Sequence, residues 1–143
     1  VSSFSFLIRS ATSLSNEDVK LTERLSIPSN KLRGFERGKV GPKDGNDFIG
    51  GNFISSINLQ SSLPFLFENS QNFDAIIFFD AANIWGVDYD STIDDGSKIR
   101  SSIGIGVDWA TIIGPLSFSL TEVITKSDND IEETFRFNLG TTF

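Results

Sequence analysis

The stretch KIRSSIGIGVDWATI, residues 98–112, decides the fold class of this protein. Apolar side chains recur on one face, and polar or small side chains occupy the other. The apolar face carries Ile99, Ile103, Ile105, Val107 and Trp109, and the opposite face carries Arg100, Ser102, Gly104, Gly106 and Asp108. A period of two residues predicts a β-strand with one apolar and one polar face.

The same alternation recurs along the chain, and no stretch shows the 3.6-residue period of an amphipathic helix. It predicts strands over about residues 2–14, 48–63, 73–85 and 98–112. A fifth strand follows the turn at Gly114-Pro115, and a sixth covers about residues 132–143. The sequence therefore predicts an all-β protein of about six antiparallel strands.

One connection is unusually long for a small domain. Residues 15–46, called the long loop below, are polar and are interrupted by two prolines and four glycines. Loops of this length are usually either functional or disordered. At 143 residues the chain is one domain or part of one, and because it starts at Val1 we expect it to have been processed or cut from a longer protein.

Composition excludes several classes of function. The formal charge of −7 disfavours nucleic acid, whose phosphates need clustered cations. Cys and His are absent, which removes disulfides, thiol or imidazole catalysts and the usual zinc ligands. The acidic loop at residues 88–96 lacks the spacing of an EF-hand, so we expect no metal site and no cofactor. No catalytic residue is predicted, and we do not expect an enzyme.

Alternation by itself leaves two architectures open. A soluble β-sandwich would bury its apolar faces against each other, whereas a membrane barrel would turn them to lipid and enclose the polar ones. No run approaches the ~20 apolar residues of a transmembrane helix, but a barrel strand needs only ~9–11 residues. The connections run long, modest, long, very short and short, and this asymmetry favours a transmembrane β-barrel.

Five ordered blocks carry a resemblance to a known family. They are Leu32-Arg33-Gly34-Phe35, Gly50-Gly51-Asn52, FDAANIW at residues 79–85, GIGVDW with GPLSF at residues 104–118, and FRFNLGTTF at residues 135–143. Together they resemble the BamA family of outer-membrane-protein assembly factors. Mitochondrial Sam, chloroplast Toc, TamA and two-partner-secretion translocators share much of this bacterial surface antigen-type pattern. The resemblance implies that residues 1–143 are the last six strands of a sixteen-stranded barrel, without POTRA domains or earlier strands, and hence an open curved sheet when alone.

The resemblance also assigns a site in the long loop. It implies that Leu32, Arg33, Gly34 and Phe35 fold back into the barrel lumen, where Arg33 meets inner-wall partners. Asp80 matches the family's acceptor, and Gln60 stands where a Glu is often found, so Asp80 would carry more of the charge. From the residues alone, a solvated turn around Arg33 stays open.

The terminal strand is the second implied site. Phe135, Phe137, Leu139 and Phe143 share one face, which would lie in lipid, and Gly140 is expected to interrupt the strand and weaken closure of the seam. The resemblance implies a factor of the bacterial outer membrane that templates β-barrel folding through this seam. Its partners would be unfolded outer-membrane proteins, accessory lipoproteins and membrane lipid, with no nucleic acid. A passive pore, a translocator barrel and a soluble β-sandwich binding module are the alternatives.

Overall fold

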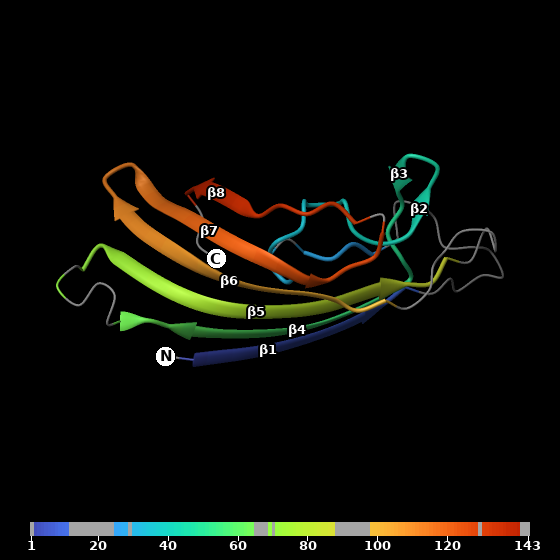
Figure 1. Ribbon diagram of the computed structural model, residues 1–143, viewed down its shortest axis with the longest axis horizontal. Coiled ribbons are helices and arrows are strands. Elements are labelled where there is room, and N and C mark those ends of the chain that lie inside the picture. The colour runs from blue at the N-terminus through green and yellow to red at the C-terminus, as the bar shows by residue number, and fades with distance from the viewer. Residues whose placement is uncertain are drawn as a thin grey trace.

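The computed structural model describes residues 2–11, 25–28, 30–64, 69, 71–87, 98–128 and 130–140. Their strands are β1 (Ser2–Ser10), β2 (Lys43–Asp44), β3 (Asp47–Phe48), β4 (Phe53–Ser62), β5 (Phe73–Trp85), β6 (Arg100–Thr111), β7 (Gly114–Thr125) and β8 (Phe135–Leu139). Six of them form one antiparallel sheet in the order β1-β4-β5-β6-β7-β8, and β2 and β3 form a separate hairpin. Figure 1 shows a single curved layer of long strands. The predicted all-β, open six-stranded sheet is confirmed.

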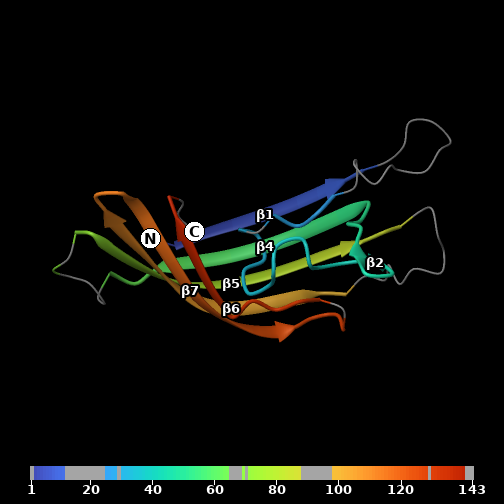
Figure 2. The same cartoon turned by 90° about the horizontal axis from the view of Figure 1, so that it is seen from above.

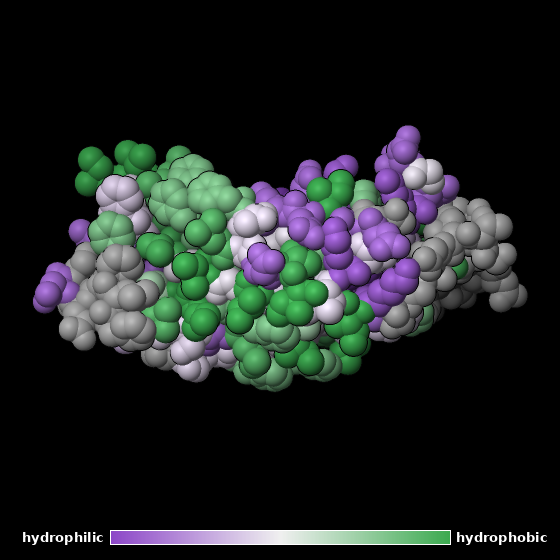
Figure 3. Space-filling model, in the orientation of Figure 1, coloured by the Kyte–Doolittle hydropathy of each residue, from purple (hydrophilic) through white to green (hydrophobic). Residues whose placement is uncertain are grey.

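The two faces of the sheet have the polarity expected for a wall between lipid and a polar interior. On the outer face the apolar side chains are exposed, among them Phe4, Phe6, Ile8, Ile57, Leu59, Ile105, Leu120 and Phe137. On the inner face the polar side chains are buried, among them Ser56, Asn58, Asp80, Arg100, Ser102, Ser117 and Ser119. Figure 3 shows apolar surface along the lower side, with hydrophilic surface gathered near the β2–β3 hairpin. The two faces assigned from sequence to residues 98–112 therefore match the structure, with Ile103, Ile105 and Trp109 exposed and Arg100 and Ser102 buried.

The long loop covers the inner face. Its described part runs along the concave side of the sheet, over β4 and β5 (Figure 2). Leu32 and Phe35 of the loop pack with Ala82 of β5, and Ile27, Val40 and Val123 surround this cluster. The hydrophobic core thus lies between the loop and the wall. No helix within the described residues is long and apolar enough to cross a bilayer.

The second predicted strand, about residues 48–63, begins too early. The β4 strand starts at Phe53, and Phe48 belongs to the β2–β3 hairpin, where it pairs with Lys43. Gly45, at φ +60°, lies in the turn of this hairpin. Gly51 lies between the hairpin and β4. A Cβ at this position would lie 2.6 Å from the carbonyl oxygen of Trp85. Only glycine fits this close approach of two backbones.

The terminal strand begins later than the predicted residue 132. The structure gives β8 as Phe135–Leu139. Gly140 has φ +82° and its N–H donates to the carbonyl oxygen of Pro115 at 2.7 Å. Gly140 is the last described residue, and its positive φ departs from the extended backbone of β8. Phe143 lies outside the described residues, as do residues 12–14 of the predicted first strand.

Candidate functional site

Arg33 of the long loop is buried against the inner face of the sheet. Its Nε and Nη2 atoms donate to the two carboxylate oxygens of Asp80 at 2.7 and 2.8 Å. Nη1 donates to Oε1 of Gln60 at 2.9 Å. The guanidinium carbon lies 3.7 Å from the centroid of the Phe78 ring, a cation–π contact. We call these four residues the Arg33 latch.

Strand geometry explains why the partners of Arg33 converge. Phe78 and Asp80 are two residues apart on β5, so both side chains point to the inner face. In the β4–β5 ladder, Gln60 is the partner of Phe78 and Asn58 is the partner of Asp80. Three neighbouring inner-face positions thus present a ring, a carboxylate and an amide oxygen to one planar cation.

Asp80 is completely buried, with an exposed side-chain fraction of 0%. Besides the two guanidinium donors, it accepts the backbone N–H of Arg33 at 3.0 Å and Nδ2 of Asn58 at 2.9 Å. A buried carboxylate is tolerated when charge and hydrogen bonds compensate its lost hydration. Removing Arg33 would leave this charge with two neutral donors.

The residues on either side of Arg33 keep the loop close to the wall. The Ser102 hydroxyl donates to the carbonyl oxygen of Arg33. Gly34 has φ +92°, and a Cβ there would lie 2.5 Å from Cγ2 of Thr121. Phe35 is buried with 2% of its surface exposed and, like Leu32, packs into the core beneath the loop. The structure therefore brings all four residues of the loop motif onto the wall.

A second buried ion pair lies at the other end of the loop, and sequence reasoning did not select it. Arg100 on β6 donates through Nε to Asp130 at 2.7 Å, and the side chains are 3% and 0% exposed. Asp130 also accepts the backbone N–H groups of Gly41 at 3.0 Å and Ser127 at 2.8 Å. The signal in the sequence was Arg100 alone, a cation on an inner face otherwise made of Ser, Gly and Asp. Asp130 could not be distinguished from a solvated carboxylate in a polar hairpin.

Arg136 connects the terminal strand to the loop. Its Nη2 donates to the carbonyl oxygen of Phe35 at 2.7 Å and to Oε2 of Glu133 at 2.9 Å. Nearby, Glu132 accepts a hydrogen bond from Lys126 at 2.9 Å, and this bond raises the pKa of Lys126. Cations therefore tie the loop to the wall, to the β7–β8 connection and to β8.

The terminal strand presents its apolar side chains outward and one backbone edge to its surroundings. Phe135, Phe137 and Leu139 are 50–55% exposed on the outer face. Thr121 donates its N–H to the carbonyl oxygen of Thr134, and Gly140 donates its N–H to that of Pro115. The even-numbered residues of the terminal segment therefore point their backbone N–H and C=O groups toward β7. In an antiparallel pair, the residues between them point their N–H and C=O groups the other way. The odd-numbered residues therefore point their backbone groups away from β7, at the edge of the described sheet.

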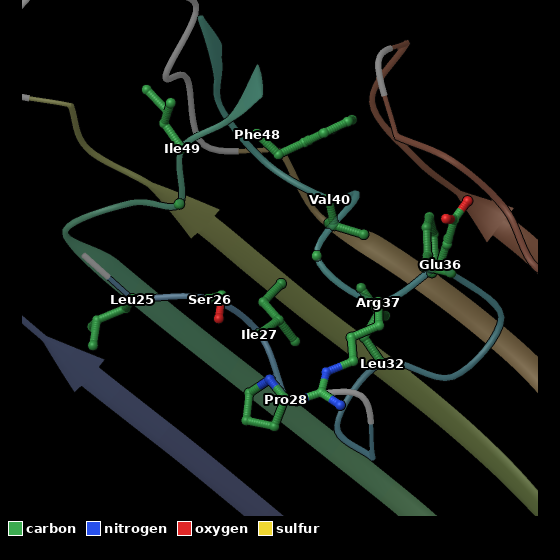
Figure 4. A pocket seen from close by; sticks show the side chains of 13 residues that line it. Leu25, Ser26, Ile27, Pro28, Leu32, Glu36, Arg37, Val40, Phe48 and Ile49 are labelled. Carbon is green, nitrogen blue, oxygen red and sulfur yellow. The ribbon is translucent and has the colours of Figure 1, made fainter. Parts of the chain in front are cut away.

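A cavity of about 320 Å³ lies inside the loop, above the sheet. Its lining includes Leu25, Ile27, Leu32, Phe35, Val40 and Ile49. Figure 4 shows that the labelled side chains, among them Leu25, Leu32 and Ile49, come from separate segments of the loop and its hairpin. No group of three or more Asp or Glu side chains among the described residues could hold a metal ion.

The fold and the latch together define a class of protein. A curved sheet that is apolar outside and polar inside, with a loop bound to its concave face, is a segment of a membrane-embedded β-barrel with an infolded loop. The chain belongs to the Omp85 superfamily, whose domain matches residues 3–143. The resemblance found in the sequence is thereby confirmed.

Individual relatives agree with this assignment. The chain is 26% identical over 132 residues to outer membrane protein assembly factor BamA of Neorickettsia risticii, covering 90% of this chain and 18% of that protein. It is 33% identical over 121 residues to the sorting assembly machinery 50 kDa subunit of Saccharomyces cerevisiae, covering 78% of this chain and 25% of that protein. The crystal structure of BamA from Haemophilus ducreyi lacking POTRA domains 1–3 superposes with a TM-score of 0.83 at 29% identity, covering 95% of this chain and 30% of that chain. The chain thus spans less than a third of the length of these relatives.

Proposed function

We propose that residues 1–143 form the C-terminal wall of an outer-membrane barrel that assembles other β-barrel proteins. In this proposal the described strands are the last six of the barrel, and earlier strands and POTRA domains belong to the whole protein. Of the relatives described above, one is named as an outer membrane protein assembly factor and one as a subunit of a sorting assembly machinery. Their names supply the activity that we assign to the whole protein of which this chain is a part.

The observation that carries the proposal is the terminal strand. The β8 strand has five residues and pairs in register with Leu116–Leu120 of β7, with one further backbone bond at each end. A free edge of N–H and C=O groups templates an incoming strand by β-augmentation. The outward Phe and Leu side chains of β8 hold this edge at the lipid boundary, where a growing client barrel has to leave.

The Arg33 latch supports the proposal by fixing the inner side of the wall. It connects the loop to β4 and β5 through charge-assisted hydrogen bonds, which are stronger than neutral ones. A rigid wall next to a weakly paired edge favours opening at that edge. The activity is exchange of backbone hydrogen bonds, so no cofactor and no covalent step is involved.

The partners follow from this mechanism. Unfolded outer-membrane proteins would pair with the edge, and lipid would contact the outer face. Accessory lipoproteins would bind mainly through the POTRA domains. Among the relatives, the BamA proteins support a bacterial outer membrane, while the sorting-machinery protein of yeast keeps a mitochondrial counterpart as the alternative.

A passive pore or a translocator barrel is a second candidate, but the structure favours it less. A pore needs an open lumen, whereas here the loop packs onto the inner face and buries Leu32 and Phe35. The soluble β-sandwich has no support, because the six strands form a single sheet that leaves its apolar face exposed.

Reconstitution of the full-length protein tests the proposal. A urea-denatured eight-stranded outer-membrane protein is diluted onto lipid vesicles, and its folding is followed by the gel mobility of the folded barrel. We expect vesicles containing the protein to accelerate folding over vesicles containing an unrelated barrel of similar size. Equal rates in the two preparations would refute the assembly function.

A further inference from the structure

The Asp130 carboxylate binds the long loop as well as Arg100. It accepts the backbone N–H of Gly41 in the loop at 3.0 Å and that of Ser127 in the β7–β8 connection at 2.8 Å. Arg100 of β6 donates to it through Nε at 2.7 Å and through Nη2 at 3.4 Å. The carboxylate therefore joins the loop, the connection and the sheet at one buried point, and its charge strengthens each of these hydrogen bonds.

Arg100 fixes this carboxylate against the wall. Its Nη1 donates to the carbonyl oxygen of Lys98 at 3.0 Å and to that of Ile84 on β5 at 3.3 Å. A planar guanidinium with several donors can bind strand carbonyls and a carboxylate at the same time. Within the described residues, no hydrogen bond joins Arg100 directly to the loop. Its hydrogen-bonded path to the loop therefore runs through Asp130.

The loop backbone between the two buried ion pairs is bonded to the same connection. Glu133 donates its N–H to the carbonyl oxygen of Gly34 at 2.8 Å. Ile131 accepts the N–H of Glu36 at 2.9 Å and donates its own N–H to the carbonyl oxygen of Lys39 at 3.0 Å. These bonds lead along the loop from one ion pair to the other.

We propose that Arg100 and Asp130 form a second latch of the long loop, called the Asp130 latch, in which Arg100 positions the carboxylate that binds Gly41. All three residues are buried within this chain. The Arg33 latch and the Asp130 latch hold the two ends of residues 33–41, so this segment docks and releases as one unit. The inference goes beyond the proposed function, because it concerns how the loop is held and applies to a pore or a translocator barrel as well.

An exposed ion pair in the same connection provides the matched control. Lys126 and Glu132 lie 2.9 Å apart, and their side chains are 41% and 42% exposed. Exposed pairs contribute little to stability because water and salt screen them. Lys126→Ala therefore removes a cation from the connection without leaving a buried carboxylate unpaired.

Hydrogen exchange resolved to single amides of the full-length protein tests the Asp130 latch. Asp130→Asn keeps an oxygen that can accept a hydrogen bond but removes the charge. We expect the Gly41 amide to lose at least about tenfold of its protection, as for loss of a hydrogen bond to a charged group. The Arg33 amide, which donates to Asp80 on β5, should lose protection to a similar degree, because the segment releases as one unit. Lys126→Ala should change neither amide by more than about threefold.

Variants of Arg100 separate positioning of the carboxylate from a general role in the wall. Arg100→Ala should release the Gly41 amide about as far as Asp130→Asn does, and Arg100→Lys, which keeps the charge, should restore part of the protection. Combining Arg100→Ala with Asp130→Asn should add little further loss, because the two residues act on the loop through one contact. Amides of β6 and β7 should stay protected in every variant, as in a folded barrel.

Three results would overturn parts of this inference. An unchanged Gly41 amide in Asp130→Asn, or additive losses in the double variant, would overturn the Asp130 latch. Release of Gly41 with an unchanged Arg33 amide would overturn docking of residues 33–41 as one unit. General loss of protection in β6 and β7 of Arg100→Lys would overturn the positioning role of Arg100. No client protein takes part in the exchange, so a failure of the assembly function leaves the inference standing.

Discussion

Replacement of Arg33 by alanine should release the long loop from the wall. The substitution leaves the Asp80 carboxylate, which is 0% exposed, with only Asn58 and one backbone N–H as donors. Breaking a buried pair by removing one partner typically costs ~3–5 kcal/mol. We take the lower end, about 3 kcal/mol, because two hydrogen bonds to Asp80 remain. This corresponds to about two orders of magnitude in the equilibrium between docked and released loop.

Hydrogen exchange on the full-length protein measures this equilibrium. Amides in residues 30–42 should lose about a hundredfold of their protection in Arg33→Ala, while amides of β5 and β6 stay protected. Arg37 is the matched control, since it is a cation of the same loop whose side chain is exposed. The substitution Arg37→Ala should change protection by less than about threefold, as a surface substitution does.

A double-mutant cycle separates the ion pair from other effects of the substitution. In Arg33→Ala combined with Asp80→Asn, no unpaired charge is left in the wall, so the loss should be smaller than the sum of the two single losses. Equal loss of protection in Arg33→Ala and Arg37→Ala, or additive losses in the cycle, would refute the latch.

Two further substitutions test separate parts of the wall. Gly34→Ala should release the loop more than Gly38→Ala in the same exchange experiment, because both glycines have positive φ but only Gly34 would place a Cβ 2.5 Å from a neighbouring side chain; similar protection in the two variants would contradict the close approach. Phe137→Arg should lower the membrane-integrated yield of the full-length protein far more than Asn138→Arg, since a lipid-facing arginine costs up to ~2–4 kcal/mol near the bilayer midplane; equal yields would contradict the orientation of β8.

Sequence patterns were sufficient for the strands whose two faces differ in polarity. The alternation from Phe73 to Trp85 gave the bounds of β5 without error, because each face has a constant environment along the strand. The block pattern that contains Leu32–Phe35 likewise led to the contact between Arg33 and Asp80. That contact followed from a resemblance and not from spacing, since the two residues are 47 positions apart.

Other features depend on contacts that no local pattern records. Glu133, predicted as part of the terminal strand, donates its N–H to Gly34 of the loop, about a hundred residues earlier in the chain. Asp130 is buried because Arg100 and Gly41 converge on it, although its neighbours in sequence are polar. In each case the partner is distant in sequence, and the residue alone is indistinguishable from a solvated one.

The proposed function requires that a client strand pair with the edge of β8. Disulfide trapping tests it directly in the reconstituted full-length protein, with single cysteines scanned along the last strand of a folding client. A cysteine at Phe137 on β8 is compared with one at Ile77 on β5, which also faces outward but lies between two paired strands. We expect strong cross-links from Phe137 that peak at one register of the client strand, and only background from Ile77. Equal cross-linking from both positions, or none from Phe137 while the client folds, would contradict it.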